Sequence, residues 1–187
     1  MNTYFLILLN LVIFITSACT QNVDKQLNES RSAIQALASN LQQTLKSSMQ
    51  TGGPIKALEV CNIEAEKIAT IVSTDLEAIV GRTSLKVRNP KNIPDAWEEE
   101  VLLYFEQQKI NGADLKTLEL YEITKNETGK WFRYMKAIPI SDVCLICHGE
   151  NVAPDIQENL HILYPNDQAK GYKAGDLRGA FTVKLKL

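Results

Sequence analysis

The segment Phe181-Thr182-Val183-Lys184-Leu185-Lys186-Leu187 decides the class of fold. Its apolar and polar side chains alternate, and this period of two predicts a half-exposed strand in an antiparallel sheet. Two earlier segments, 118–124 and 131–138, are rich in β-branched and aromatic residues. The turn-forming sequence Asn126-Glu127-Thr128-Gly129 separates these two segments, so we expect them to form a β-hairpin.

Helices are expected ahead of these strands. Apolar side chains recur every three or four residues within 21–49, which predicts an amphipathic helix. Thr51-Gly52-Gly53-Pro54 should end this helix and begin a second one. The second helix carries Cys61 on its apolar face and should end at Gly81.

The middle of the chain adds one strand and one helix. Residues 82–88 alternate moderately and predict a strand, and the loop at 89–94 is rich in turn-forming residues. Asp95 has the character of an N-cap for a third helix. Because helices lead and strands and another helix follow, the sequence predicts an α+β protein.

Length and charge exclude several classes of protein. The chain has 187 residues, of which 45% are hydrophobic and 22% are charged, so it can form one globular domain with its own core. It has 20 Lys and Arg against 22 Asp and Glu, a formal net charge of -2. This balance gives no reason to expect a nucleic-acid partner.

The first eighteen residues have the character of a signal peptide. They carry no charged side chain, and the apolar run at 4–15 is too short to span a bilayer comfortably. Thr16-Ser17-Ala18-Cys19 then resembles a bacterial lipoprotein signal, in which Cys19 is lipidated and becomes the mature N-terminus. An ordinary cleaved signal with a spare cysteine is the alternative. We therefore expect an exported protein, lipid-anchored at the periplasmic side of a bacterial membrane, with inner or outer membrane undecided.

The segment Cys144-Leu145-Ile146-Cys147-His148 matches the attachment pattern of c-type heme. In this pattern two thiols add across the vinyl groups of the macrocycle, and the adjacent histidine donates a nitrogen to the iron. The sequence therefore predicts one covalent heme c, held by Cys144 and Cys147 with His148 as an axial ligand. Export agrees with this prediction, because heme c is attached outside the bacterial cytoplasm.

The cysteine pair has three alternative uses. A thioredoxin-like redox pair needs a βαβ context, which the expected order of elements lacks. A zinc site needs more ligands near the pair than His161 alone supplies. A structural disulfide between Cys144 and Cys147 is compatible with export and stays open.

The second axial ligand cannot be chosen from spacing alone. The sequence offers Cys61, His161, Met49 and Met135. Methionine more often fills gaps in a core than binds metal, and His161 lies in a polar stretch typical of a surface. A cysteine on an apolar helix face is usually a small buried hydrophobe, but a lone thiol in an exported protein is unusual.

Several patches resemble the single-heme c-type cytochromes with a PAS-like fold, once catalogued only as a domain of unknown function. They lie at 57–62, 81–84, 88–98, 144–149, 164–172 and 175–181. The resemblance implies helices followed by a five-stranded antiparallel sheet, with covalent heme ligated axially by His148 and Cys61. Together with the expected signal peptide, it divides the chain into a signal peptide at 1–18, a tether and first helix at 19–53, and a PAS-like heme domain at 54–187.

Two protein ligands would saturate the iron, which favours an electron carrier over an enzyme. A thiolate ligand stabilises ferric iron, so we expect a low reduction potential and an unidentified redox partner protein. The alternative is a heme-based redox or gas sensor that acts through a separate signalling partner. A heme enzyme would need a distal acid–base pair, which the sequence does not clearly offer. Four arginines were considered for pairing with heme propionates, with Arg88 favoured among Arg82, Arg88, Arg133 and Arg178.

Overall fold

The structure is a computed structural model that describes the backbone of residues 3–187 and the side chains of residues 22–187. The predicted lipidation at Cys19, and the side chains of the predicted signal peptide at 1–18, lie outside the described part. In the part of the chain whose side chains are described, no helix is long and apolar enough to cross a membrane.

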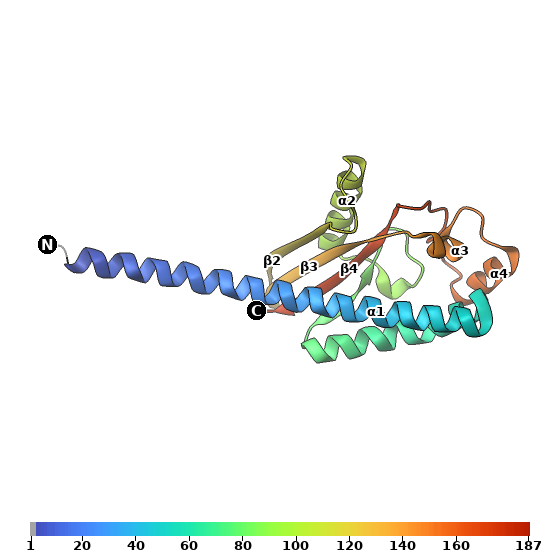
Figure 1. The fold of residues 1–187 in the computed structure, drawn as a ribbon, viewed down its shortest axis with the longest axis horizontal. Coiled ribbons are helices and arrows are strands. Elements are labelled where there is room, and N and C mark those ends of the chain that lie inside the picture. Colours follow the sequence, from blue (N-terminus) through green and yellow to red (C-terminus); the bar gives the residue numbers. More distant parts are fainter. Residues whose placement is uncertain (1–2) are drawn as a thin grey trace.

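One long helix, α1 (Thr3–Leu76), is broken near its middle. Gly52 and Gly53 leave helical geometry, with φ of −158° and 71°, and Pro54 follows directly. Glycine adopts such a positive φ without strain, and proline suits the first turn of the next helical segment. The predicted break at Thr51–Pro54 is therefore confirmed. Figure 1 shows that the second arm (54–76) runs back alongside the first arm (3–51).

The sheet has four antiparallel strands in the order β1-β4-β3-β2. Their bounds are β1 (Ile79–Thr83), β2 (Glu119–Asn126), β3 (Gly129–Pro139) and β4 (Leu177–Lys186). The predicted hairpin is confirmed, since β2 pairs with β3 and Asn126 lies opposite Gly129.

Two expectations about strands differ from the structure. The second arm of α1 ends at Leu76 rather than Gly81, so the strand expected at 82–88 lies earlier, at Ile79–Thr83. Ser73 Oγ accepts a hydrogen bond from Val80 N at 2.9 Å and so fixes this early turn. Residues 3–187 form four strands, where the resemblance implied five. The segment between β3 and β4 folds into short helices and turns, with one isolated bridge between Gly149 and Tyr172.

Short helices complete the fold. They are η1 (Pro90–Asn92), α2 (Ala96–Ile110), η2 (Asp142–Cys144), α3 (Leu145–His148) and α4 (Pro154–Leu163). The predicted N-cap of α2 is confirmed by a capping box, in which Asp95 and Glu98 each accept a hydrogen bond from the other's backbone N–H. The resulting order of helices and strands confirms the α+β class.

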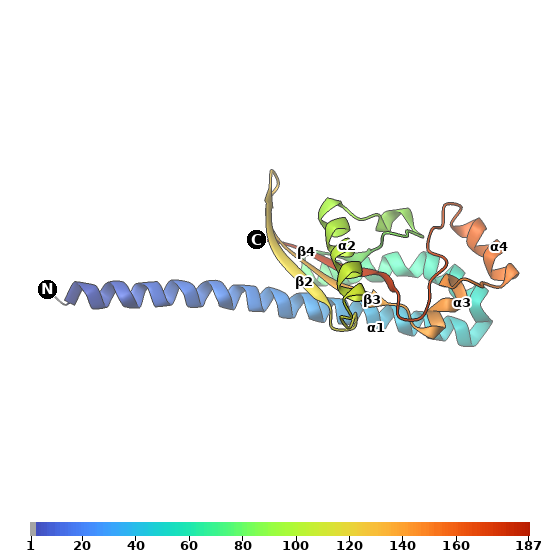
Figure 2. The same ribbon diagram turned by 90° about the horizontal axis from the view of Figure 1, so that it is seen from above.

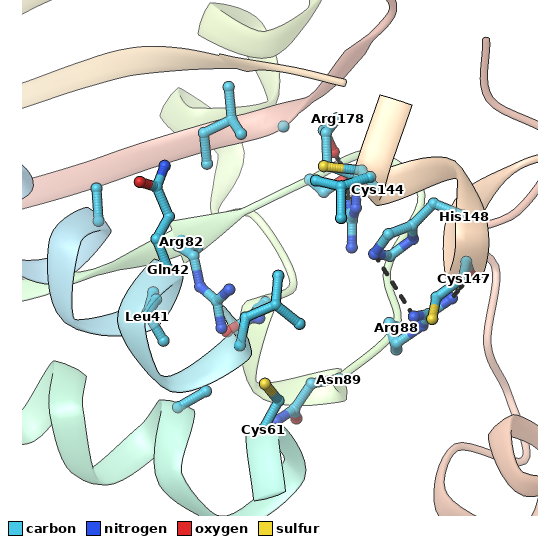
Figure 3. A pocket seen from close by; sticks show the side chains of 18 of the residues that line it. Leu41, Gln42, Cys61, Arg82, Arg88, Asn89, Cys144, Cys147, His148 and Arg178 are labelled. Carbon is cyan, nitrogen blue, oxygen red and sulfur yellow. Dashed lines mark hydrogen bonds between the residues drawn. The ribbon is translucent and has the colours of Figure 1, made fainter. Parts of the chain in front are cut away.

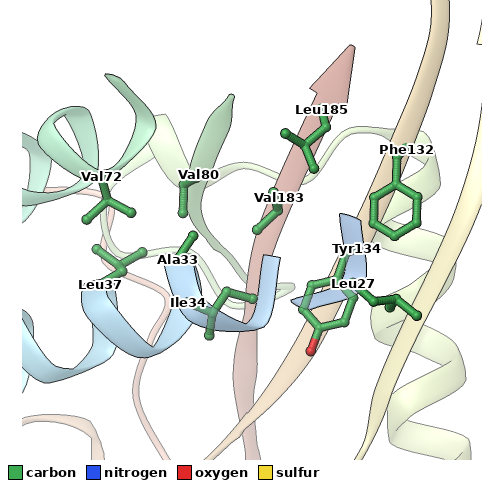
Figure 4. Close-up of a cluster of buried hydrophobic side chains, with 10 residues drawn as sticks. All are labelled: Leu27, Ala33, Ile34, Leu37, Val72, Val80, Phe132, Tyr134, Val183 and Leu185. Carbon is green, nitrogen blue, oxygen red and sulfur yellow. The ribbon is translucent and has the colours of Figure 1, made fainter. Parts of the chain in front are cut away.

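Helices cover both faces of the sheet. Figure 2 shows α1 on one side of the strands and α2 on the other. The α1 side buries the cluster drawn in Figure 4, which joins both arms of α1 to β1, β3 and β4. Its members are Leu27, Ala33, Ile34, Leu37, Val72, Val80, Phe132, Tyr134, Val183 and Leu185. Residues 27–37, which belong to the predicted first helix, thus pack into the same core as the strands.

The last strand is more deeply buried than its alternation predicts. β4 lies between β1 and β3, and α2 covers the face that was expected to meet solvent. Thr182 on that face is buried, and its hydroxyl donates a hydrogen bond to Glu98 Oε1 at 2.7 Å. A polar residue can occupy this covered position because a carboxylate of α2 satisfies it.

Candidate functional site

A pocket of about 360 Å³ opens at the kinked end of α1 (Figure 3). Its walls come from both arms of α1, from the segment after β1, and from the η2–α3 region. A volume of this size is within the usual range for pockets that hold small molecules and cofactors. The pocket therefore joins residues that lie more than 100 positions apart in the sequence.

Most of the pocket lining is apolar. The apolar side chains are Ala38, Leu41, Leu45, Met49, Ala57, Leu58, Ala65, Val87, Ile138, Pro139, Val143, Ile146 and Phe181. The inner faces of both predicted amphipathic helices thus serve two purposes. Near the sheet they fill the core, and near the kink they line the pocket.

The Cys-x-x-Cys-His segment forms one wall of the pocket through η2 and α3. Cys144 and Cys147 both line it, and both are free thiols that form no disulfide with each other. Gly149 ends α3, and its N–H donates a hydrogen bond to the Leu145 carbonyl at 2.9 Å. A Cβ at Gly149 would lie only 2.6 Å from that oxygen, so the tight turn requires glycine.

His148 is held in one tautomer by the backbone behind it. Its Nδ1 lies 2.8 Å from the carbonyl oxygen of Ala169, which can only accept, so Nδ1 carries the proton. The lone pair is then on Nε2, which lines the pocket with the rest of the ring. Burial lowers the pKa of His148 to about 2, and the nearby charges of Arg88 and Arg178 act in the same direction. Arg88 Nη1 lies 3.5 Å from this Nε2 (Figure 3). A neutral imidazole whose Nε2 carries the lone pair is the form that binds a metal.

A buried ion pair supports this arrangement from one side. Arg88 Nη2 lies 3.0 Å from Asp167 Oδ2, and the two side chains are 10% and 2% exposed. The same nitrogen donates a hydrogen bond to the Cys147 carbonyl at 2.6 Å. Asp167 Oδ1 accepts a hydrogen bond from the N–H of Ala169 at 2.9 Å. The pair therefore connects the end of α3 to the loop whose carbonyl orients His148.

Cys61 enters the same pocket from the second arm of α1. Figure 3 shows its thiol and the imidazole of His148 pointing into one space from separate walls. Burial raises the pKa of the Cys61 thiol, and the positive charge of Arg82 opposes that change. A thiol kept neutral by burial becomes a thiolate when a metal binds it.

Of the other candidate axial ligands, His161 and Met135 lie outside the pocket and Met49 lines it. His161 is exposed on α4, and Met135 is buried in the cluster between the sheet and α2. Met49 does line the pocket, from the first arm of α1. Within the described residues, no three Cys, His, Asp or Glu side chains come together in a way that would hold a bare metal ion.

The donor set fits a metal carried inside a macrocycle. One imidazole nitrogen and one thiol face a shared apolar space, and two further thiols lie beside the imidazole. Soft thiolate and imidazole ligands suit iron in a porphyrin, which needs only two protein donors. The residues of the pocket therefore fit heme c.

A family model described as Tll0287-like matches residues 18–185. The chain belongs to the Tll0287-like family. The crystal structure of the cyanobacterial heme protein Tll0287 is similar to it, with a TM-score of 0.64 and 26% sequence identity. The match covers 87% of this chain and 95% of that one. Comparison with curated protein sequences gives no match.

In this Tll0287-like chain, the four arginines considered from sequence have different surroundings. Arg82, Arg88 and Arg178 line the pocket, whereas Arg133 lies against α2, where it pairs with Asp95 at 2.7 Å. Arg88, the favoured propionate partner, has Asp167, two backbone carbonyls and the Nε2 of His148 as partners within the protein.

Sequence reasoning missed two parts of the site. It did not anticipate that the first arm of α1, with Leu41 and Leu45, would cover the pocket, although the apolar stripe was visible. It also missed the support that Asp167 and the Ala169 carbonyl give to His148. No periodic pattern marks such loop contacts, and only the patch at 164–172 drew attention to them.

Proposed function

We propose that this protein is a monoheme c-type cytochrome that acts in low-potential electron transfer. The single observation that carries the proposal is that Cys144, Cys147, His148 and Cys61 line one apolar pocket. Membership of the Tll0287-like family supports it, because a similar structure is that of a heme protein. Sequence identity to that structure is 26%, so the assignment of a c-type heme and its ligands rests on the residues of the pocket.

Each residue has a defined role in this proposal. Cys144 and Cys147 would hold the macrocycle through thioether bonds, and His148 Nε2 and Cys61 Sγ would bind the iron. The bound heme supplies a one-electron couple between ferric and ferrous iron. The Ala169 carbonyl fixes the imidazole orientation, and the Arg88–Asp167 pair holds that carbonyl in place.

The ligand set favours a carrier. With His148 and Cys61 both bound to the iron, a substrate would have no free position on it. A thiolate donates charge and favours the ferric state, so the reduction potential is low. Apolar surroundings favour the ferric state as well. With a thiolate ligand the ferric porphyrin is neutral, whereas the ferrous form carries a negative charge that an apolar pocket solvates poorly.

The proposed location and partner follow from the N-terminal sequence. Cys19 is the lipidated residue, and the protein faces the periplasm, anchored to a membrane and meeting a redox partner protein there. Replacing Cys19 with alanine should release the protein from the membrane fraction into the soluble periplasmic fraction. Retention of the variant in the membrane fraction would contradict the lipid anchor.

Spectroscopy of the purified protein tests the proposal. A pyridine hemochrome spectrum should show one c-type heme per chain, and this heme should remain with the chain in acidified acetone. Substituting both Cys144 and Cys147 with alanine should abolish covalent retention. Heme that is extracted from the unmodified protein, or a chain that acquires no heme in a cell able to assemble c-type cytochromes, would overturn the assignment.

A gas-binding test separates the carrier from the alternative sensor. Carbon monoxide added to the reduced protein should leave the optical spectrum unchanged, because Cys61 and His148 both stay bound. Rapid stoichiometric binding would instead show that a ligand leaves on reduction, which is the behaviour expected of a sensor.

A further inference from the structure

Arg82 is a pocket cation without a counter-charge. It lies in β1 with its side chain toward the pocket (Figure 3). Among the described residues, no carboxylate forms an ion pair with it and no side chain or backbone oxygen accepts a hydrogen bond from it. The charged or titratable groups that act on it are Arg178, Cys61 and Tyr164, and Arg178 carries the same sign of charge. Arg82 is half-buried, and burial lowers its pKa.

The other arginines near the sheet and pocket all have oxygen partners. Arg88 pairs with Asp167, and Arg133 pairs with Asp95. Arg178 donates hydrogen bonds to Ser84 Oγ at 2.9 Å and to the Lys86 carbonyl at 3.3 Å. An unpaired guanidinium beside an apolar space is unfavourable unless an anionic group joins it there.

The position of Arg82 specifies which part of the cofactor it can meet. In Figure 3 it lies across the pocket from Cys144 and Cys147, toward Leu41 and Gln42 of the first arm of α1. The vinyl and propionate groups of heme lie on opposite edges of the macrocycle. Fixing the vinyl edge at the cysteine pair therefore directs the two carboxylates toward the far end of the pocket.

We infer that Arg82 binds a propionate carboxylate of the heme and so fixes the orientation of the macrocycle in the pocket. The inference rests on the proposed function. Guanidinium and carboxylate form two parallel charge-assisted hydrogen bonds, and the pair becomes stronger where water is scarce. Gln42 lies on the neighbouring wall and can donate a further hydrogen bond from its amide. This assigns to Arg82 the role that sequence reasoning favoured for Arg88.

Binding of two porphyrins to a thioether-free protein tests the inference. The full chain with Cys144→Ala and Cys147→Ala is titrated with hemin and with hemin dimethyl ester, which lacks free carboxylates, in the same detergent. Hemin should bind at least about tenfold more tightly than the ester, as expected for a charge-assisted hydrogen bond. Adding Arg82→Gln should reduce this preference to about twofold or less, and Arg82→Lys should restore part of it.

Arg178→Gln is the matched control, because it removes a second pocket arginine, one whose Nη1 already donates hydrogen bonds to Ser84 and Lys86. It should leave the preference for hemin intact, and far-UV circular dichroism should show that each variant is folded. Equal binding of both porphyrins to the Arg82-containing protein would overturn the role of Arg82 while leaving a heme pocket. Loss of the preference in Arg178→Gln but not in Arg82→Gln would also overturn it. Binding of neither porphyrin would show that heme retention depends on the thioether bonds, and the covalent holoprotein below then decides the role of Arg82; failure of the unsubstituted chain to acquire heme is what would contradict the proposed function.

A second measurement uses the covalent holoprotein. The propionate bending band in the resonance Raman spectrum should shift in Arg82→Gln and stay in place in Arg178→Gln. An unchanged band in Arg82→Gln would contradict the contact even if the porphyrin titrations were affected by folding.

Discussion

The Nδ1–H of His148 donates a hydrogen bond of 2.8 Å to the carbonyl of Ala169, twenty-one residues further along the chain. The backbone N–H of Ala169 is in turn bound by the carboxylate of Asp167. A proposed iron ligand is therefore oriented by a loop that lies far from it in sequence, and the loop is held by a buried ion pair between Asp167 and Arg88.

Breaking that ion pair should cost substantial stability. In Asp167→Asn the amide oxygen can still accept from Ala169, but Arg88 loses its counter-charge in a buried position. Removing one partner of a buried pair typically costs about 3–5 kcal/mol. Urea unfolding should therefore show a loss of about 3 kcal/mol. Lys67→Gln, which removes a surface pair with Glu64, should cost less than about 1 kcal/mol. Equal losses in the free energy of unfolding would show that the Arg88–Asp167 pair stabilises the fold no more than a surface pair does.

Removing the Cys61 thiol should change the spectrum and raise the reduction potential. Cys61→Ala takes away the thiolate that favours ferric iron, and it leaves one iron position open. Electron paramagnetic resonance should lose the low-spin signal typical of thiolate ligation, and the reduced variant should now bind carbon monoxide. Met49→Leu is the control, since Met49 also lines the pocket. If Met49→Leu produced these changes and Cys61→Ala did not, Met49 would be the ligand.

Glu119 should make stability depend on pH in the acid range. Its carboxylate accepts hydrogen bonds from Tyr134 Oη at 2.6 Å and from Arg31 Nε at 3.2 Å, and Lys136 Nζ lies 3.8 Å away. The hydrogen bond from Arg31 is the main reason that the pKa of Glu119 is lowered. A lowered pKa means that the stabilisation is fully present above the ordinary glutamate value of about 4.3 and is lost as pH falls through the lowered pKa.

The comparison with Glu119→Gln measures this contribution. At pH 7 the variant should be less stable by about 1 kcal/mol, a modest value because the groups are partly exposed to solvent. The difference from the unmodified protein should shrink toward zero as the pH is lowered below about 4. A difference that stayed constant from pH 7 to pH 3 would show that ionisation of Glu119 is not its source.

Gly179 should not tolerate a side chain. Its φ is 152°, and a Cβ there would collide with the Thr83 carbonyl and lie 2.9 Å from Ser84 Cβ. Gly179→Ala should therefore push β4 away from the end of β1 at the pocket wall, at a cost of about 1–3 kcal/mol. Gly112→Ala is a suitable control, because it also has a positive φ of 86° but has no atom within 4 Å of a new Cβ. Thermal unfolding should show a clearly lower midpoint for Gly179→Ala than for Gly112→Ala.

The parts of the fold that were predictable are those with local causes. Gly52, Gly53 and Pro54 break α1 because of their own backbone preferences, and the Asp95–Glu98 capping box starts α2 within a single turn. The β2–β3 hairpin depends on the short turn after Asn126. Each of these signals acts between residues only a few positions apart, so the sequence displays it directly.

The parts that were not predictable depend on distant contacts. From its neighbours in sequence, Gly81 is predicted to end a helix, but pairing with β4 places it inside β1. The burial of Thr182 depends on Glu98, which lies 84 positions earlier. Within the site, the Cys-x-x-Cys-His segment was evident from spacing alone, whereas Asp167 and the unpaired state of Arg82 became evident only when loops and strands were assembled.

The kink in α1 also determines the direction from which this protein can be approached. From residue 22 to residue 51 the first arm is about 45 Å long, at 1.5 Å per residue. The pocket lies at the kinked end of this rod, and the rod separates it from the upstream end of the helix (Figure 1). If that upstream end is held at a surface, the rod acts as a spacer. In the proposed role of electron carrier, and with the rod upright on that surface, a partner embedded in the same surface would be too distant for a single electron-tunnelling step. The partner would then have to reach outward to the kinked end.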